Sequence, residues 1–171
     1  MLLVLGLGAC SSSTKVGDGT TSVPSTKAPR VPKIKATPGP CPSVYPRVPL
    51  ATLNAGVKGR DTKLVPFEAE SVRVCIYRVS NLKASGTVPS SAVSKFEADT
   101  NALPKATNRL DCPGETITRL FFVTFQNASQ RVHVGASDAC GGNAGNGALR
   151  AAEKQSWVDD VMRFATKKEP A

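Results

Sequence analysis

The residues in this chain with the most reactive side chains are five cysteines and one histidine. The cysteines are Cys10, Cys41, Cys75, Cys112 and Cys140, and the histidine is His133. Zinc ligands in proteins usually follow one another at short intervals, as in CxxC or HxxxH, and none of these residues has such a neighbour. We therefore expect no metal and no other cofactor.

His133 is the one residue that could act as the base of a nucleophile–base pair. In the hairpin expected around it, His133 lies mid-strand on the polar face, opposite Thr124, where a histidine is usually a solvated surface residue. The sequence contains no GxSxG, SxxK or HExxH motif. Two carboxylate pairs, Glu68 with Glu70 and Asp159 with Asp160, are better explained as solvated charge and helix-dipole partners. We expect no catalytic residues.

The most unusual segment is rich in glycine and asparagine, and it spans residues 141–147. Backbone N–H groups of such a loop can bind an anion, so its polar and glycine positions form a candidate ligand loop: Gly141, Gly142, Asn143, Gly145, Asn146 and Gly147. It lacks the Lys-Ser/Thr of a phosphate-binding P-loop. Because glycine and asparagine tolerate positive φ, a mobile connection is the preferred interpretation.

Cys10 ends an apolar segment, and Leu7-Gly8-Ala9-Cys10 resembles the lipobox of bacterial lipoproteins. In that motif the thiol is alkylated by diacylglycerol, palmitate is a typical acyl chain, and the bond before the cysteine is cut. We expect residues 1–9 to be a signal peptide and Cys10 to carry lipid on the outer face of the cytoplasmic membrane. No Lys or Arg precedes Cys10, so the signal peptide is expected to be truncated and to start further upstream.

Residues 11–40 are dominated by Ser, Thr, Pro, Gly and Lys, with five basic residues and one acidic residue. They contain too little apolar surface to offset the entropy of ordering, so residues 10–40 are expected to form a lipidated, disordered linker. Its charge would attract anionic lipid or cell-wall polymer. The alternative, which we favour, is a solvated stalk whose composition keeps it soluble.

Residues 41–171 are expected to form a single folded domain, because they are long enough for one hydrophobic core. The clearest element is a hairpin with strands at 116–125 and 131–136. A turn at 127–130 pairs Phe125 with Val132, Val123 with Val134 and Phe121 with Ala136 on the core face. The opposite face is mostly polar.

Further strands are expected at 71–78 and, as short edge strands, at 63–66 and 148–151. Apolar periodicity predicts one helix from Ser90 or Ser91 to Leu103, with either serine as its cap, and another at 153–166. The fold class is α+β, a small antiparallel sheet with two helices packed on one face and two disulfides.

The hairpin constrains the disulfides. Cys112 precedes its first strand and Cys140 follows its second, so antiparallel pairing brings both to the same end. This predicts a Cys112–Cys140 bridge and, by elimination, a Cys41–Cys75 bridge.

The net charge of +9 suggests nucleic-acid binding at first sight. However, nearly half of that charge lies on the linker, and few aromatic residues are interleaved with the basic ones. We therefore expect no nucleic-acid partner.

Several short motifs together resemble a group of uncharacterised actinobacterial secreted lipoproteins. They are Cys41-Pro42 after a Pro-rich stalk, Val74-Cys75-Ile76-Tyr77-Arg78, Leu103-Pro104, Cys112-Pro113 and Cys140-Gly141-Gly142 with Asn146-Gly147. The resemblance covers about residues 41–150 and implies an exported, disulfide-bonded domain, but no activity.

Two functions remain open. The first is a membrane-anchored envelope lipoprotein whose domain is a non-enzymatic binding module, with the membrane, an anionic cell-wall polymer or another envelope protein as partner. The second is a hydrolase or transferase acting on the cell wall, which a cleft with two carboxylates of raised pKa would favour.

Overall fold

The structure, a computed structural model, describes residues 37–106, 119–138 and 142–165. Within these ranges the elements are α1 Leu50–Leu53, β1 Ser71–Arg78, β2 Asn81–Thr87, α2 Ser90–Asn101, β3 Leu120–Gln126, β4 Arg131–Ser137, β5 Asn143–Gly145, β6 Arg150–Ala152 and α3 Gln155–Ala165. The signal peptide at 1–9, most of the linker at 10–40, and the residues Cys112, Cys140 and Gly141 lie outside the described residues.

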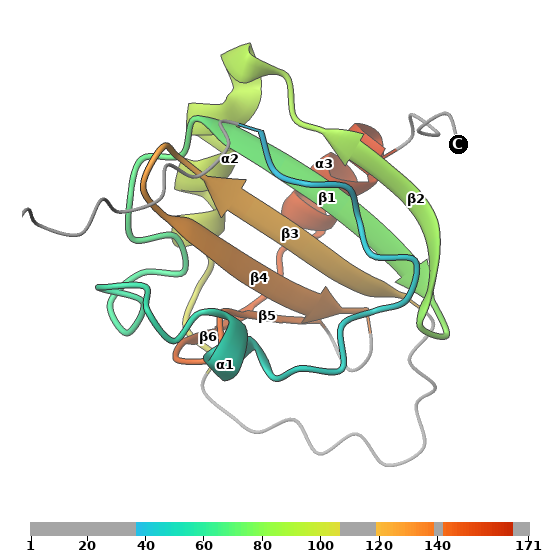
Figure 1. Cartoon of the computed structure of the whole chain (residues 1–171), viewed down its shortest axis with the longest axis horizontal. Helices are drawn as coiled ribbons and strands as arrows, with labels where there is room; N and C mark the ends of the chain where they lie inside the picture. Colours follow the sequence, from blue (N-terminus) through green and yellow to red (C-terminus); the bar gives the residue numbers. More distant parts are fainter. Residues whose placement is uncertain (1–36, 107–118, 139–141, 166–171) are drawn as a thin grey trace, which may run out of the picture. The chain divides into compact units, whose positions relative to one another are not determined.

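The described strands form one antiparallel sheet in the order β2-β1-β3-β4-β5-β6 (Figure 1). The α+β class is therefore confirmed. Helices α2 and α3 lie behind the sheet in this view, and α1 lies in front of it.

The β3–β4 hairpin has the predicted register, with Phe125 opposite Val132, Val123 opposite Val134 and Phe121 opposite Ala136. All of these side chains are buried in the main core, where they meet Val72, Val74 and Ile76 of β1. The alternation of apolar and polar residues fixed this register because a slip by one residue would turn every core side chain to the other face.

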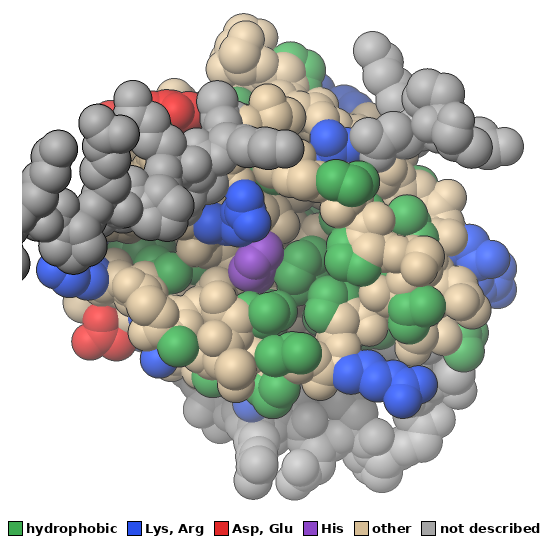
Figure 2. Space-filling view, viewed as in Figure 1, with side chains coloured by type: hydrophobic (Ala, Val, Ile, Leu, Met, Phe, Trp, Pro, Cys, Tyr) green, Lys and Arg blue, Asp and Glu red, His purple; other side chains and the backbone are tan. Residues whose placement is uncertain are grey.

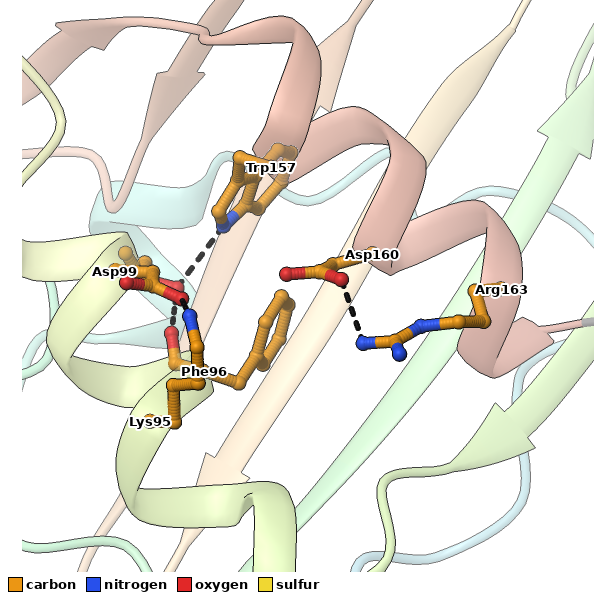
Figure 3. Close-up of polar contacts among 7 residues, drawn as sticks. Lys95, Phe96, Asp99, Trp157, Asp160 and Arg163 are labelled. Atoms are coloured by element: carbon orange, nitrogen blue, oxygen red, sulfur yellow. Dashed lines mark hydrogen bonds and ion pairs between the residues drawn. The ribbon is translucent and has the colours of Figure 1, made fainter.

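Helices α2 and α3 close the core through Phe96 and Trp157. The two rings stack with their centroids 6.1 Å apart, and the Trp157 indole N–H donates to the Thr100 hydroxyl at 3.0 Å. Figure 3 shows this contact together with two ion pairs on the helix surfaces. Lys95 pairs with Asp99 on α2, and Arg163 pairs with Asp160 on α3. Both helices were predicted, but the predicted serine cap of α2 is wrong, because Pro89 occupies the N-cap position and no side chain caps the helix.

Strand β2 was not predicted, since its sequence NLKASGT has few β-branched or aromatic residues. A turn with positive φ at Val79 and Ser80 returns the chain from β1. Gly86 of β2 is required by the close approach of α3, because a Cβ there would lie 1.9 Å from the Phe164 carbonyl oxygen. Tertiary packing therefore outweighs weak local propensity at this strand.

The expected edge strand at 63–66 is wrong. Leu64 and Val65 are buried core residues in a loop, and the Asn101 side chain bonds both the N–H and the carbonyl of Val65 at 2.9 Å. A side chain thus takes the place of a neighbouring strand. The edge strand expected at 148–151 exists in part, as β6.

The second sheet face, which is mostly polar on β3 and β4, is crossed by a segment that is distant in the sequence. Residues 37–54, here called the N-terminal strap, cross it (Figure 1). The predicted disulfide Cys41–Cys75 attaches the strap to β1, and Tyr45 packs edge-on against Tyr77 and Phe122. Alternation along the strands does not reveal this cover, but the predicted Cys41–Cys75 bridge already brings the beginning of the strap onto the outward face of β1.

Candidate functional site

A pocket of about 310 Å³ lies between the strap and the sheet. The strap and the sheet each line it, with Gly39, Pro40, Pro42, Pro46 and Leu53 from the strap and Arg73, Cys75, Phe122, Thr124, Arg131 and His133 from the sheet. Figure 2 shows this side of the molecule, where the purple histidine lies beside basic side chains and a group of hydrophobic ones. We call this cavity the sheet pocket.

Strand register brings the sheet side chains together. Arg73, Thr124 and His133 lie side by side in one row across β1, β3 and β4. The next row of the same face holds Cys75 and Phe122. The sheet pocket therefore lies between a polar row, which holds Arg73, Thr124 and His133, and the apolar row next to it.

His133 is not the solvated strand residue that the sequence indicated. Its ring stacks on Phe122 at 4.9 Å between centroids, and its Nδ1 lies 3.0 Å from the Thr124 hydroxyl. Burial, and secondly the charge of Arg131, lowers the pKa of His133 to about 4. The imidazole is therefore neutral at pH 7.

The peptide group of His133 is held as well. The Asn54 side chain accepts from the His133 N–H at 2.9 Å and donates to its carbonyl at 2.7 Å. β5 pairs only with residues 135–137 of β4, so the Asn54 amide continues the hydrogen-bond ladder of β4 beyond the end of β5. This contact also places α1 and the end of the strap over β4.

Thr124 and His133 form a hydroxyl–imidazole pair of the kind used in nucleophilic catalysis. However, Thr124 is only 7% exposed, and no carboxylate among the described residues lines the sheet pocket to orient the ring. The hydrogen bond joins directly opposed residues of two strands, which is an ordinary cross-strand contact. The arrangement is suited to holding a ligand rather than to transferring a proton.

The basic end of the sheet pocket contains Arg73 and Arg131. The Arg131 Nε donates to the Gln126 Oε1 at 2.7 Å, which draws its side chain over β3 towards β1. The sequence reasoning missed both arginines, although each occupies an outward position of a correctly predicted strand. The sequence shows that these arginines alternate with apolar residues, but it does not show that a pocket lies above them.

The candidate ligand loop has a different structure from the one expected. Residues 143–145 form β5, so the interpretation as a mobile connection is wrong for this part. The Asn146 amide is fully buried and donates to the carbonyls of Arg60, Lys63 and Leu64. Its Oδ1 accepts from the N–H groups of residues 148 and 149. These polar groups face inwards, and Gly142, Asn143, Gly145, Asn146 and Gly147 do not line the sheet pocket.

A second, smaller cavity of about 240 Å³ contains Asp138 and Glu153. Burial, with the nearby Asp138 as the next cause, raises the pKa of Glu153 to about 7. Arg119 holds both oxygens of Asp138, through its backbone N–H and its Nε, each at 2.8 Å. The sequence had singled out other carboxylates, of which Asp159 and Asp160 accept from neighbours on α3, and Glu68 and Glu70 are exposed.

Comparison with known proteins gives no match to a family model, a curated protein or a solved structure. In the part of the chain that the structure describes, no helix has the length and apolar character needed to span a membrane. The same residues contain no cluster of three or more His, Cys, Asp or Glu side chains that could hold a metal ion. The site must therefore be interpreted from its own geometry.

Proposed function

We propose that this protein is a membrane-anchored envelope lipoprotein whose folded unit is a non-enzymatic binding module, with the sheet pocket as its ligand site. The lipobox-like Leu7-Gly8-Ala9-Cys10 supports export and lipid anchoring. Lipid on Cys10 would hold the protein at the outer face of the cytoplasmic membrane. The resemblance to actinobacterial secreted lipoproteins belongs to the same proposal.

The observation that carries the binding role is the sheet pocket itself. Three prolines and Cys75, which is bonded to Cys41, line it, and these groups lose little conformational freedom when a ligand enters. Its size lies at the small end of ligand pockets, and a few polar groups converge on a largely apolar lining. This is the composition of a preformed site for a small molecule.

The folded unit would present this pocket at a distance from the membrane. The basic residues of the linker, Lys15, Lys27, Arg30, Lys33 and Lys35, would favour contact with anionic lipid or wall polymer. Such contact should weaken as salt rises, because the Debye length falls from about 10 Å at 0.1 M to about 3 Å at 1 M. Another envelope protein remains an alternative partner.

Lipid anchoring is tested by the substitution Cys10→Ala. The variant should no longer incorporate labelled fatty acid in the native host, because the acceptor thiol is gone. Unchanged labelling would refute lipidation at Cys10.

The binding role is tested by screening small organic fragments against the oxidised full chain carrying Cys10→Ser, with amide shifts mapped by NMR. Fragments should shift the residues around Phe122 and His133. Leu53→Trp should reduce binding by filling the pocket mouth, since Leu53 is 37% exposed and lines it. Val48→Trp is the matched control, because Val48 is an exposed strap residue outside the lining. The absence of any hit in the sheet pocket would refute the binding role.

A second candidate function is a cell-wall hydrolase or transferase, and Glu153 is the observation that favours it. A carboxyl group with a pKa of about 7 can act as a general acid at neutral pH. Asp138 is a poor second group because Arg119 holds both of its oxygens, so we rank this function below binding. If it were correct, the protein would degrade purified peptidoglycan, Glu153→Gln would abolish the activity, and Glu70→Gln at an exposed position would not.

A further inference from the structure

We propose that the sheet pocket binds a small organic carboxylate with a flat apolar body, its carboxylate between Arg73 and Arg131 and its body against Phe122 and the strap prolines. This inference rests on the proposed binding function and adds the chemical class of the ligand. It follows from the distribution of charge, apolar surface and aromatic groups around the cavity.

The first argument is charge. Arg73 and Arg131 line the sheet pocket, and among the described residues no Asp or Glu does. An anion entering the pocket therefore meets two guanidinium groups. Arginine presents N–H donors in a planar fork that matches a carboxylate, which makes this pairing stronger than a neutral hydrogen bond.

The second argument is reach. Arg73 and Arg131 lie on β1 and β4, which flank β3, so their strands are about 10 Å apart. The hydrogen bond from Arg131 to Gln126 at 2.7 Å turns the Arg131 side chain over β3 and shortens this gap. A single carboxylate above β3 can then be approached from both sides.

The third argument concerns Gln126, the other partner at this end. Gln126 is fully buried, and its Nε2 has no hydrogen-bond partner in the part of the chain that the structure describes. This donor belongs to the same amide group that accepts from Arg131. A buried donor without a partner is unfavourable, and an acceptor that reaches this amide from beside Arg131 would relieve that cost, although Gln126 itself does not line the pocket.

The fourth argument is the apolar part of the ligand. Most of the lining is apolar, and the stacked rings of Phe122 and His133 present a flat surface with centroids 4.9 Å apart. Because burial and Arg131 lower the pKa of His133 to about 4, its ring remains neutral and suited to stacking at pH 7. Inorganic phosphate would leave these apolar walls unused, so an organic anion fits the pocket better.

The test uses two probes of the same shape, naphthoate and its neutral amide naphthamide. Their dissociation constants would be measured by amide shift titration of the oxidised full chain carrying Cys10→Ser. Naphthoate should bind at least tenfold more tightly than naphthamide, since one guanidinium–carboxylate contact of moderate strength corresponds to that factor. Arg73→Gln and Arg131→Gln should each remove most of this preference without changing naphthamide binding.

Arg78→Gln is the matched control. Arg78 is an exposed arginine at the end of the same strand as Arg73 and does not line the pocket. Its replacement lowers the net charge equally and should leave the preference for naphthoate unchanged. A tenfold loss in Arg78→Gln would show that only the overall charge of the domain attracts the probe, which would overturn the proposal.

The remaining outcomes separate this inference from the function beneath it. Equal affinity for the two probes would overturn carboxylate recognition and leave the binding role intact. Failure of both probes, with other fragments still bound in the sheet pocket, would have the same meaning. If no probe and no fragment shifts the pocket residues, the ligand class and the proposed function both fail.

Discussion

Asn146→Ala should destabilise the folded unit far more than its position in a glycine-rich segment suggests. The side chain is fully buried. Its removal leaves three carbonyl groups and two N–H groups without their present partner, those of Arg60, Lys63, Leu64, Ala148 and Leu149. The effect depends on how many of these backbone groups can be reached by water after the substitution.

Burial divides these groups. Lys63 and Ala148 are exposed and Arg60 is half-buried, so water can replace the amide at these positions. Leu149 is half-buried like Arg60, so water can also reach its N–H, whereas Leu64 is buried and its carbonyl is the group left unsatisfied. At about 1–3 kcal/mol for such a group, we expect a loss of about 1–3 kcal/mol in the free energy of unfolding.

Asn127→Ala provides a matched control at the β3–β4 turn. Its Oδ1 also accepts from the N–H groups two and three positions ahead, at 3.0 and 2.8 Å. Because Ser129 is exposed and Gln130 is half-buried, water can take over, and the loss should be about 1 kcal/mol or less. Comparing Asn127→Ala with Asn146→Ala therefore isolates the effect of burial on the free energy of unfolding, because both substitutions remove the same side-chain turn contacts.

Urea unfolding of the oxidised proteins, with equal m-values as the criterion for comparison, measures both losses. Asn146→Asp adds a second contrast, because it retains an acceptor but directs a carboxylate oxygen at the three carbonyl groups. We expect this variant to be at least as unstable as Asn146→Ala at pH 7. Equal losses for Asn146→Ala and Asn127→Ala would refute the argument from burial.

Three further predictions concern the disulfide, the titrating groups and α3. Cys75→Ser removes the Cys41–Cys75 bridge, with a sequence separation of 34, and should cost about 3–4 kcal/mol from loop-closure entropy; an unchanged melting temperature without reductant would contradict it. His133 has a pKa lowered from 6.5 to about 4, so its unfolded form binds the proton better and stability is lost as pH falls from 6.5 to 4. Glu153 has a pKa raised from 4.5 to about 7, so its folded form holds the proton better and stability is lost as pH rises from 4.5 to 7. As pH rises across this range, the free energy of unfolding should decrease in His133→Gln, where Glu153 still titrates, and increase in Glu153→Gln, where His133 still titrates. Parallel pH profiles of the two variants would be incompatible with these shifts. Gly86→Ala should cost about 1–3 kcal/mol by thermal or urea unfolding, since a Cβ would lie 1.9 Å from the Phe164 carbonyl oxygen. Gly39→Ala is the control, because a Cβ there meets nothing within 4 Å. A comparable loss in Gly39→Ala would rule out the clash as the cause.

Much of the core could be predicted because it depends on local pattern. Alternating residues in β1, β3 and β4 specify which side chains face inwards, and the turn at Asn127 specifies how β3 and β4 pair. The spacing of Trp157 and Val161 on α3 specifies the face of that helix that packs on the sheet. In each case neighbouring residues carry the whole signal.

The candidate site could be predicted only in its parts. Thr124 and His133 were placed opposite each other, and their hydrogen bond follows from that register. The low pKa of His133 did not follow, because it is caused mainly by burial. The ring stacks on Phe122 in a pocket that the strap also lines, and alternation along a strand reports which residues share a face but not what covers it.

By itself, the sequence determined the α+β class, the hairpin register, the two larger helices and the attachment of Cys41 to Cys75. Only the tertiary structure decided that the strap encloses a pocket on the second sheet face and that Asn54 and Asn146 join distant segments. Asn54 donates to a carbonyl 92 residues away, and Asn146 to one 86 residues away. The physical reason is that hydrophobic periodicity is a local property, whereas a buried amide is satisfied by whichever backbone groups the completed fold brings within hydrogen-bond distance.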